Sequence, residues 1–343
     1  MDLVEQDYER VASLLKDFNI TGKRIMITGA TGMIGSFIVS SLLHADEVYG
    51  LGNTVVGLCR NAAKLKSLVA ADSSFLEIHT IPDIADFIDD FPVDYVIHTA
   101  CNTTSSYMMS NPVETVDGIY RGTRAVLEYA RKVKPTKVIF LSSMEVYGEI
   151  SEETVVDEDS LLGNLTVSSV RSGYPMAKRL SENLAVAYSA EYRVPVCILR
   201  LAQTFGVVTK PDTRYFYQLI ESAVKGNDII LRTKGDKINN FCYLSDAVRA
   251  MIYIMHNGAD GEIYNVSDRS STMTIREMAE LTADRLADGK IKAVVELDEV
   301  LASKYAKTSK YIMDSTKLNK LGWKAEVHLE DALRRNVEYQ TSL

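Results

Sequence analysis

The sequence predicts an α/β fold in which a doubly wound parallel sheet is joined to a smaller C-terminal α/β lobe. Its length of 343 residues and its hydrophobic fraction of 46% are sufficient for a large buried core. The apolar runs expected to form strands are continuous and do not alternate with polar residues. Helical segments separate these runs, and both features are typical of a parallel sheet that helices cover on its two faces.

The expected elements follow in order along the chain. Apolar residues at helical spacing in 2–18 predict a short amphipathic helix that packs against the body of the protein. After an opening strand at 25–28, further strands are expected at 54–59, 75–78, 94–100, 137–141 and 196–200. Helices are expected after the opening strand to about 43, after 82–84 to about 91, from 111 to about 132, and from 175 to about 192.

The regular alternation of strand and helix ends near residue 206. Short strands and helices follow it without βαβ regularity. We therefore predict one large domain, formed by 1–206 and about 238–258, and a smaller lobe, formed by about 207–237 and 259–343.

Composition argues against several classes of partner. The formal net charge is −8 and no stripe of Lys or Arg offsets it, so we expect neither a nucleic-acid nor an anionic-membrane partner. The N-terminus is too polar for a secretory signal, and no window reaches the eighteen or so apolar residues of a membrane span. The four cysteines lie far apart and the five histidines show no ligand spacing, so we expect reduced thiols, a cytoplasmic protein and no metal site.

A glycine turn follows the opening strand. Gly29, Gly32 and Gly35 stand three residues apart, where an apolar run breaks and then resumes as a helix. Glycine lets a ligand approach the backbone, and the N–H groups at the start of the helix would face that ligand, which predicts a seat for a pyrophosphate. The spacing is one residue wider at its start than the usual dinucleotide fingerprint, so an ordinary turn between strand and helix stays open as an alternative.

Three polar residues further along have the chemistry for proton transfer. Tyr174 and Lys178 are four residues apart, so they share one face of the expected helix. An ammonium beside a tyrosine favours the phenolate, which can take a proton from a hydroxyl. Ser143 ends the fifth strand at the carboxyl edge of the sheet, where open α/β sheets bind ligands. Each residue alone would suit an ordinary strand end or helix, and it is their order after the glycine turn that favours chemistry.

With these motifs in this order, the chain resembles an extended short-chain dehydrogenase/reductase of the nucleotide-sugar epimerase/dehydratase family. The matching segments are collinear and lie at 28–35, 83–84, 98–100, 122–128, 142–148, 174–178, 243–246, 264–266 and 321–323. The resemblance implies a Rossmann-type domain, a nicotinamide cofactor stretched across the sheet edge, and a small-molecule substrate, a nucleotide sugar, in the smaller lobe.

The resemblance also implies roles for individual residues. Tyr174 would act as acid and base on a sugar hydroxyl, Lys178 would hold the nicotinamide ribose and lower the tyrosine pKa, and Ser143 would hydrogen-bond the reacting oxygen. Asp83 and Ile84 would flank the adenine. The other residues expected to contact the cofactor are Gly29, Thr31, Gly32, Met33, Ile34, Gly35, Arg60, Thr99 and Ala100.

Glu145 bears on the second step of the reaction. In the sugar 4,6-dehydratases of the family the segment reads Thr-Asp-Glu, with the Asp as acid on the C6 hydroxyl and the Glu as base at C5, whereas here it reads Ser143-Met144-Glu145. Met144 cannot donate a proton, so loss of water by that route is in doubt. Deprotonation at C5, epimerisation or decarboxylation stays open, and UDP-glucuronate decarboxylases look similar here. A solvated loop position is the alternative for Glu145.

Three positions depart from the family pattern. Arg60 follows the second strand where the family has an acidic residue for the adenosine ribose, so NAD and NADP stay equally open as cofactors. Gln203 replaces an Asn, and Asn239 replaces an arginine that commonly grips the substrate diphosphate. An amide is a poor substitute for a guanidinium on phosphate. The residues that would take over this role are Arg214, Arg232 and Lys237, unless the substrate is not a standard nucleotide sugar.

The main hypothesis is an enzyme that oxidises a sugar at C4, alters the keto intermediate and reduces it again. Arg60 and the lost phosphate clamp favour, as an alternative, a NADP(H)-dependent sugar or carbonyl reductase with an exchangeable cofactor. A cofactor-binding regulator without turnover is disfavoured, because the catalytic candidates are all present. Relatives of this family lead us to expect a homodimer. Two long helices carry apolar positions that would permit this contact but would equally suit a monomer core: Val126, Leu127, Leu184 and Val186.

Overall fold

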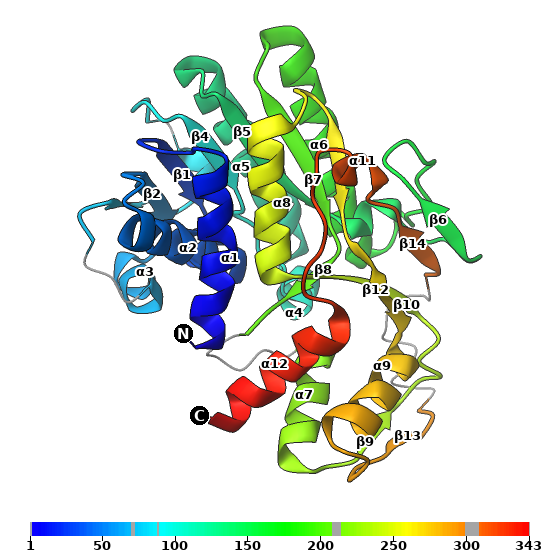
Figure 1. The fold of residues 1–343 in the computed structure, drawn as a ribbon. Coiled ribbons are helices and arrows are strands. Elements are labelled where there is room, and N and C mark those ends of the chain that lie inside the picture. The colour runs from blue at the N-terminus through cyan, green and yellow to red at the C-terminus, as the bar shows by residue number, and fades with distance from the viewer. Residues whose placement is uncertain (1, 70–72, 88, 208–213, 299–308, 343) are drawn as a thin grey trace.

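A seven-stranded parallel sheet lies at the centre of the protein. The computed structural model describes residues 2–69, 73–87, 89–207, 214–298 and 309–342. The strand order is β11-β7-β5-β4-β1-β2-β3 (Figure 1), and every neighbouring pair is parallel. The predicted fold class is therefore confirmed. The strands are β1 (Arg24–Thr28), β2 (Thr54–Cys59), β3 (Leu76–Thr80), β4 (Tyr95–His98), β5 (Lys137–Ser143), β7 (Val196–Leu201) and β11 (Ile263–Val266).

Helices cover both faces of this sheet (Figure 1). Strand β1 shows why the strands of this sheet are apolar along their whole length. Ile25 and Ile27 belong to the core on one face of the sheet, and Met26 belongs to the core on the other face. One face packs on α1 (Leu3–Asp17), α2 (Met33–Tyr49), α3 (Ala62–Val69) and α8 (Leu244–Asn257). The other face packs on α5 (Pro112–Val133) and α6 (Gly173–Tyr192), which lie side by side.

Local signals fix where the helices begin. Asp2 accepts hydrogen bonds from the N–H groups of Val4 and Glu5, and the Glu5 carboxylate accepts one from the N–H of Asp2, which forms a capping box at α1. Pro112 occupies the first turn of α5, where its missing N–H costs no hydrogen bond. The helices predicted at 2–18, 111–132 and 175–192 are thus confirmed.

The helix predicted to run to about residue 91 is wrong. The structure has only a 3₁₀ turn, η1 (Ile84–Asp86), and residue 88 lies outside the described residues. Pro92 disfavours helical backbone in the residue before it. The carbonyl of that residue, Phe91, instead accepts a hydrogen bond of 2.7 Å from the Tyr129 hydroxyl, which holds Phe91 against α5.

A smaller lobe stands below the large sheet in the view of Figure 1. Its core joins the strands β8 and β10 to the helices α7, α9 and α12. Its mixed sheet has the order β12-β10-β8, and two pairs, β13-β9 and β14-β6, lie outside it. The strands are β6 (Thr154–Val156), β8 (Gln203–Phe205), β9 (Ile229–Leu231), β10 (Ile238–Tyr243), β12 (Asp268–Thr274), β13 (Ala293–Val295) and β14 (Tyr311–Met313).

The remaining helices and turns lie between the strands or, in the case of α12, after the last strand. They are α4 (Ser105–Ser110), η2 (Met144–Tyr147), η3 (Val170–Ser172), α7 (Tyr215–Lys225), α9 (Ile275–Leu281), η4 (Thr282–Leu286), α11 (Thr316–Asn319) and α12 (Leu329–Ser342). One strand from the range predicted for the smaller lobe, β11, pairs with β7 and so extends the large sheet. This strand is only four residues long and contains the polar Asn265, so it could not be recognised as a sheet strand in advance. The other domain boundaries stay a prediction.

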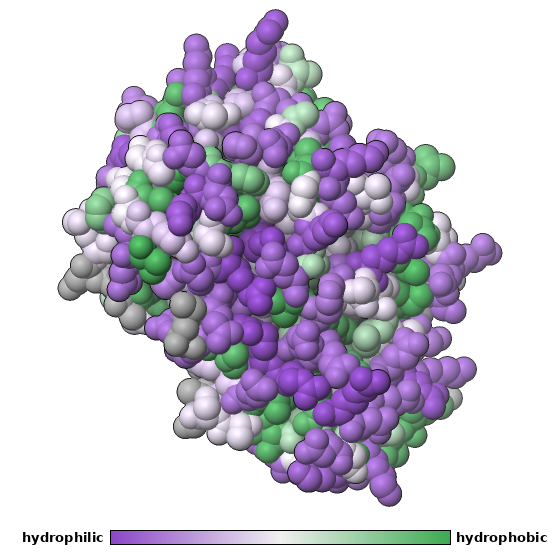
Figure 2. Space-filling view, in the orientation of Figure 1, coloured by the Kyte–Doolittle hydropathy of each residue, from purple (hydrophilic) through white to green (hydrophobic). Residues whose placement is uncertain are grey.

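Few of the apolar residues named for the predicted homodimer contact reach the surface. Val126 and Leu127 are buried against the sheet, Leu184 is partly buried, and only Val186, 37% exposed, reaches the surface. The homodimer stays a prediction. Figure 2 shows one face of the molecule as mainly hydrophilic, with hydrophobic residues in small separate groups. Among the described residues, no helix is long and apolar enough to cross a membrane.

A buried ion pair joins β7 to α6. The Arg200 guanidinium donates to the Glu182 carboxylate at 2.9 Å, and both side chains are almost completely buried. Arg200 also donates to the Tyr147 hydroxyl and the Glu158 carbonyl, each at 3.2 Å. Burial alone would lower the pKa of Arg200, but its hydrogen bonds and the charge of Glu182 reverse this and raise it. The buried Arg200 and Glu182 charges therefore stabilise each other.

Replacing Arg200→Met should destabilise the fold strongly, because it leaves the Glu182 carboxylate buried without a partner. We expect the free energy of unfolding to fall by about 3–5 kcal/mol, measured by urea unfolding followed by circular dichroism. The matched control is Lys225→Met, which removes an exposed pair with Glu221 and should change stability by less than about 1 kcal/mol. Equal stability of the Arg200 variant and the native protein would contradict this account.

Candidate active site

The glycine turn forms a cradle at the end of β1. Gly29 has φ +69°, and a Cβ on it would lie 2.8 Å from the Ala100 Cα of the loop after β4. A Cβ on Gly35 would collide with the Gly29 carbonyl oxygen, and one on Gly32 would approach that oxygen to 3.3 Å. The close packing of these backbones leaves room only for glycine.

The cradle fits the diphosphate of a dinucleotide. Gly32 precedes α2 with no side-chain cap, so the first N–H groups of a 17-residue helix face the turn unshielded. Thr31, Met33 and Ile34 stand at this helix start, each partly accessible. The Met33 sulfur also lies 3.2 Å from Nη2 of Arg214, so Arg214 belongs to the rim of the cradle.

The loop after β4 is tied to the cradle by hydrogen bonds. The Thr99 hydroxyl donates to the Thr28 carbonyl at 2.7 Å, and the Ala100 N–H donates to the Thr28 hydroxyl at 3.2 Å. The Thr28 hydroxyl also pairs with Nδ1 of His98 at 2.7 Å. Burial and the charge of Lys178 lower the pKa of His98 to about 3, so this imidazole is neutral at pH 7. The sequence motif contains His98, but its positioning role is visible only in the structure.

The predicted adenine contacts occupy the other end of the same edge. Asp83 is exposed and accepts a hydrogen bond of 2.9 Å from the N–H of Ala85, which caps η1. Ile84 packs closely over Gly122 of α5, where a Cβ would lie 2.7 Å from its methyl group. Arg60 is exposed directly after β2, and in the described ranges its guanidinium has no recorded partner. The contact of these three residues with the adenosine stays a prediction.

The catalytic candidates meet at the end of β5. Tyr174 and Lys178 stand on α6, and the Tyr174 side chain hydrogen-bonds Ser143, the last residue of β5. The Lys178 ammonium donates to the Leu141 carbonyl at 2.7 Å and lies 6.0 Å from the Tyr174 ring centre. Tyr174 and Lys178 are only 5% and 4% exposed, so the group is preorganised inside the protein.

Electrostatics at Tyr174 differ from the expectation that Lys178 lowers its pKa. Burial raises the Tyr174 pKa well above 10, and the charges of Cys101 and Glu145 act in the same direction. The hydrogen bond from Ser143 and the charge of Arg171 oppose them. Because the Lys178 ammonium is turned to the Leu141 carbonyl, its effect on Tyr174 is not among the largest. Tyr174 is therefore neutral at pH 7 in this geometry and able to donate a proton.

Glu145 lies beside this group and is paired. Its Oε1 accepts a hydrogen bond of 2.8 Å from Nη2 of Arg171, and both side chains are about one-third exposed. Glu145 is thus a paired, partly exposed residue, and its role as a base stays a prediction. Arg171 was absent from the predicted site, although its place three residues before Tyr174, on the same turn of the chain, was a usable signal.

The expected substrate residues divide into two groups. Nε2 of Gln203 donates to Oδ1 of Asn239 at 2.9 Å, and Oε1 of Gln203 is buried with no hydrogen-bond partner among the described residues. This pair lines β8 and β10 and carries no charge. Arg232 instead forms an exposed ion pair with Glu296 at 2.7 Å, in the outer part of the smaller lobe. Arg232 therefore has no recorded contact with the Tyr174 group.

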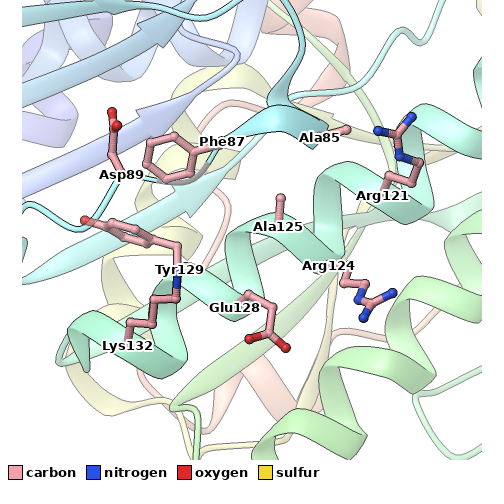
Figure 3. A pocket seen from close by; sticks show the side chains of 9 residues that line it. All are labelled: Ala85, Phe87, Asp89, Arg121, Arg124, Ala125, Glu128, Tyr129 and Lys132. Carbon is pink, nitrogen blue, oxygen red and sulfur yellow. The ribbon is translucent and has the colours of Figure 1, made fainter.

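A separate surface pocket lies between η1 and α5. Its cavity of about 300 Å³ contains none of the catalytic candidates. Figure 3 shows the Phe87 and Tyr129 rings against each other at one end and the Arg121 and Arg124 side chains turned away at the other. In the part of the chain that the structure covers, no cluster of three or more His, Cys, Asp or Glu side chains is placed to hold a metal ion.

Comparisons with known proteins agree with this geometry. Residues 25–267 match the model of the NAD dependent epimerase/dehydratase family. The chain is 28% identical over 316 residues to UDP-glucuronic acid decarboxylase 6 of Arabidopsis thaliana, covering 90% of this chain and 86% of that one. It is 30% identical over 262 residues to UDP-N-acetyl-alpha-D-glucosaminuronate decarboxylase of Bacillus cytotoxicus, covering 75% and 78%.

The fold has solved counterparts. One is the UDP-glucose 4-epimerase of Thermotoga maritima, crystallised with UDP-glucose, which matches with a TM-score of 0.76 at 21% identity and covers 93% of this chain and 99% of that one. The family match and the two decarboxylase relatives together confirm the resemblance seen in the motifs. The chain belongs to the NAD dependent epimerase/dehydratase family.

Proposed function

We propose that this enzyme oxidises the sugar of a nucleotide sugar at C4, alters the resulting 4-keto sugar at C5, and reduces it again with the cofactor held throughout. The observation that carries this proposal is the Ser143, Tyr174 and Lys178 group, buried at the same sheet edge as the glycine cradle. The names of the relatives, which include decarboxylases and an epimerase of nucleotide sugars, support the substrate class.

The chain's own residues supply the proton chemistry. The Tyr174 phenolate, which forms only after the neutral hydroxyl of this geometry has lost its proton, takes the proton of the C4 hydroxyl as the hydride leaves C4. The resulting hydroxyl returns a proton when the keto group is reduced. Ser143 hydrogen-bonds the reacting oxygen and Tyr174 together. Lys178, fixed by the Leu141 carbonyl, would hold the nicotinamide ribose. When bound, the nicotinamide accepts the hydride and gives it back.

The neighbourhood of Glu145 favours C5 chemistry over loss of water. A 4-keto group acidifies the C5 hydrogen, and Glu145 stands beside Tyr174 where it could remove that hydrogen. Met144, the position of the acid in 4,6-dehydratases, is 7% exposed and has no proton to donate, and the Tyr311 hydroxyl fixes its carbonyl at 2.8 Å. Epimerisation or decarboxylation at C5 is therefore the step this site supports best.

Product analysis tests the proposed function. Purified protein is incubated with UDP-, dTDP-, CDP- and GDP-sugars, and the products are identified by mass and NMR. A product altered at C4 or C5 with no net use of cofactor is expected. Net consumption of NADPH with no requirement for a nucleotide would favour the alternative reductase, which Arg60 and the uncharged Asn239 position motivate.

Tyr174→Phe removes the hydroxyl that moves the proton but keeps the ring that fills the site. We expect turnover to fall by about 100-fold or more, with cofactor affinity nearly unchanged, measured by steady-state kinetics and calorimetry. Tyr192→Phe, near the exposed end of the same helix, is the matched control and should keep native turnover. Near-normal activity of the Tyr174 variant would remove Tyr174 from its role.

Gly35→Ala should close the cradle, since the added Cβ meets the Gly29 carbonyl. We expect the Kd for NAD to rise at least about tenfold, equivalent to about 1.4 kcal/mol. Gly118→Ala on α5 is the control, because a Cβ there has no neighbour within 4 Å. Calorimetry gives the Kd, and circular dichroism confirms that both variants fold. Unchanged NAD affinity would show that the turn is not the diphosphate seat.

Arg60→Ala tests the choice between the two cofactors. A guanidinium that contacts a 2′-phosphate contributes a charged hydrogen bond of about 1.5–3 kcal/mol, so the Kd for NADP should rise about tenfold or more while that for NAD changes little. Lys64→Ala, which removes a nearby exposed cation of α3, should affect neither. An equal change for both cofactors would mean that Arg60 stacks on the adenine.

A further inference from the structure

Two cations and one carboxylate converge beside Tyr174 from three different elements. Glu145 stands on η2, Arg171 on η3, and Lys237 directly before β10. Arg171 donates to Glu145 at 2.8 Å, and Lys237 lies near enough to both for its charge to interact with theirs. We call Arg171, Lys237 and Glu145 the anion subsite, because their charges leave one positive charge in excess.

Lys237 has no partner of its own. Its side chain is half-buried, and no hydrogen bond or ion pair is recorded for its ammonium within the described ranges of the chain. Burial lowers its pKa and Arg171 adds to this effect, while Glu145 opposes it. The one carboxylate that acts on this ammonium, Glu145, is already paired with Arg171, so a further anionic ligand would stabilise the poorly solvated Lys237.

Arg171 has donors to spare. Of its five N–H groups, only one on Nη2 is recorded as donating to a protein oxygen among the residues described. A guanidinium binds a planar carboxylate through two parallel hydrogen bonds, and an ammonium adds a point charge. Arg171 and Lys237 can therefore share one anion without breaking the contact between Arg171 and Glu145.

The place of the subsite indicates where on the substrate that anion is attached. The charges of Glu145 and Arg171 both act on Tyr174, so the subsite adjoins the group that meets the sugar hydroxyl. Asn239 of β10, where an arginine would be expected to bind a diphosphate, is 1% exposed and already bonded to Gln203, so it adds no positive charge. The excess positive charge is thus concentrated at the reacting end of the site.

Building on the proposed function, we propose that the anion subsite binds a carboxylate of the sugar, so that the substrate class is nucleotide-linked uronic acids. The carboxylate would lie between Arg171 and Lys237 while a ring hydroxyl lies at Tyr174. A neutral hexose on the same nucleotide offers these cations no counter-charge. Lys237 is then a specificity-determining residue supplied by the smaller lobe to a site otherwise built on the large sheet.

The test compares matched substrates that differ only in the carboxylate. Binding of UDP-glucuronate against UDP-glucose, and of GDP-mannuronate against GDP-mannose, is measured by calorimetry on the NAD-loaded protein, together with absorbance at the wavelength of the reduced cofactor. For at least one pair, we expect the uronate to bind about tenfold or more tighter than the hexose. Lys237→Met should remove most of this preference, and Lys237→Arg should restore it.

A control variant and the remaining outcomes distinguish a carboxylate subsite from a role of Lys237 in binding the diphosphate. Lys234→Met makes the same charge change at an exposed position of the same loop and should leave the preference intact. An equal loss of uronate and hexose binding in Lys237→Met would assign Lys237 to the diphosphate and overturn the proposal, as would no preference in the native protein. Uronate binding that depends on Lys237 without any cofactor reduction would support the subsite but contradict the proposed C4 oxidation.

Discussion

The close approach of two backbone segments at the end of β1 is the constraint on which the site depends. The turn at Gly29 and the loop at Ala100 come so near that a Cβ on Gly29 would force them apart. Hydrogen bonds from Thr99 and Ala100 to Thr28 hold β4 in register with β1. Since β5 is the next strand, its last residue, Ser143, is delivered to the same edge. The register of neighbouring strands in the large sheet thus positions both the glycine cradle and the residues for proton transfer.

The smaller lobe is fixed to this edge by buried polar contacts. β8 begins only one residue after β7 ends, so the lobe continues directly from the large sheet. The Asp7 carboxylate on α1 accepts hydrogen bonds from Tyr243 at 2.6 Å and from Arg335 at 2.8 Å, which joins the first helix to β10 and to the last helix. These contacts set the position of β10, and with it the position of Lys237 relative to Glu145.

Sequence patterns predicted what is local and missed what depends on long-range pairing. The strands of the large sheet, the glycine cradle and the Tyr174 and Lys178 pair follow from continuous apolar runs and short spacings. Arg171 was within reach of the same reasoning because it precedes Tyr174 by three residues. Lys237 was named only as one of three candidates, because its approach to Glu145 requires the parallel pairing of β10 with β8. The effect of burial on the Tyr174 pKa could not be predicted from the spacing of Tyr174 and Lys178, because burial depends on how α6 packs.

The pairing of Glu145 with Arg171 links substrate recognition to the second step of the reaction. An ion pair stabilises the carboxylate and makes it a weaker base. A substrate carboxylate bound to the other donors of the same guanidinium would share its positive charge, so the Glu145 hydrogen bond would remain while the electrostatic stabilisation of Glu145 fell. Lys237 would supply the further positive charge that the new anion needs. Glu145 would then gain basicity only in the complex with a uronate. A neutral hexose leaves the ion pair intact, so the arrangement discriminates against it both in binding and in the strength of the base.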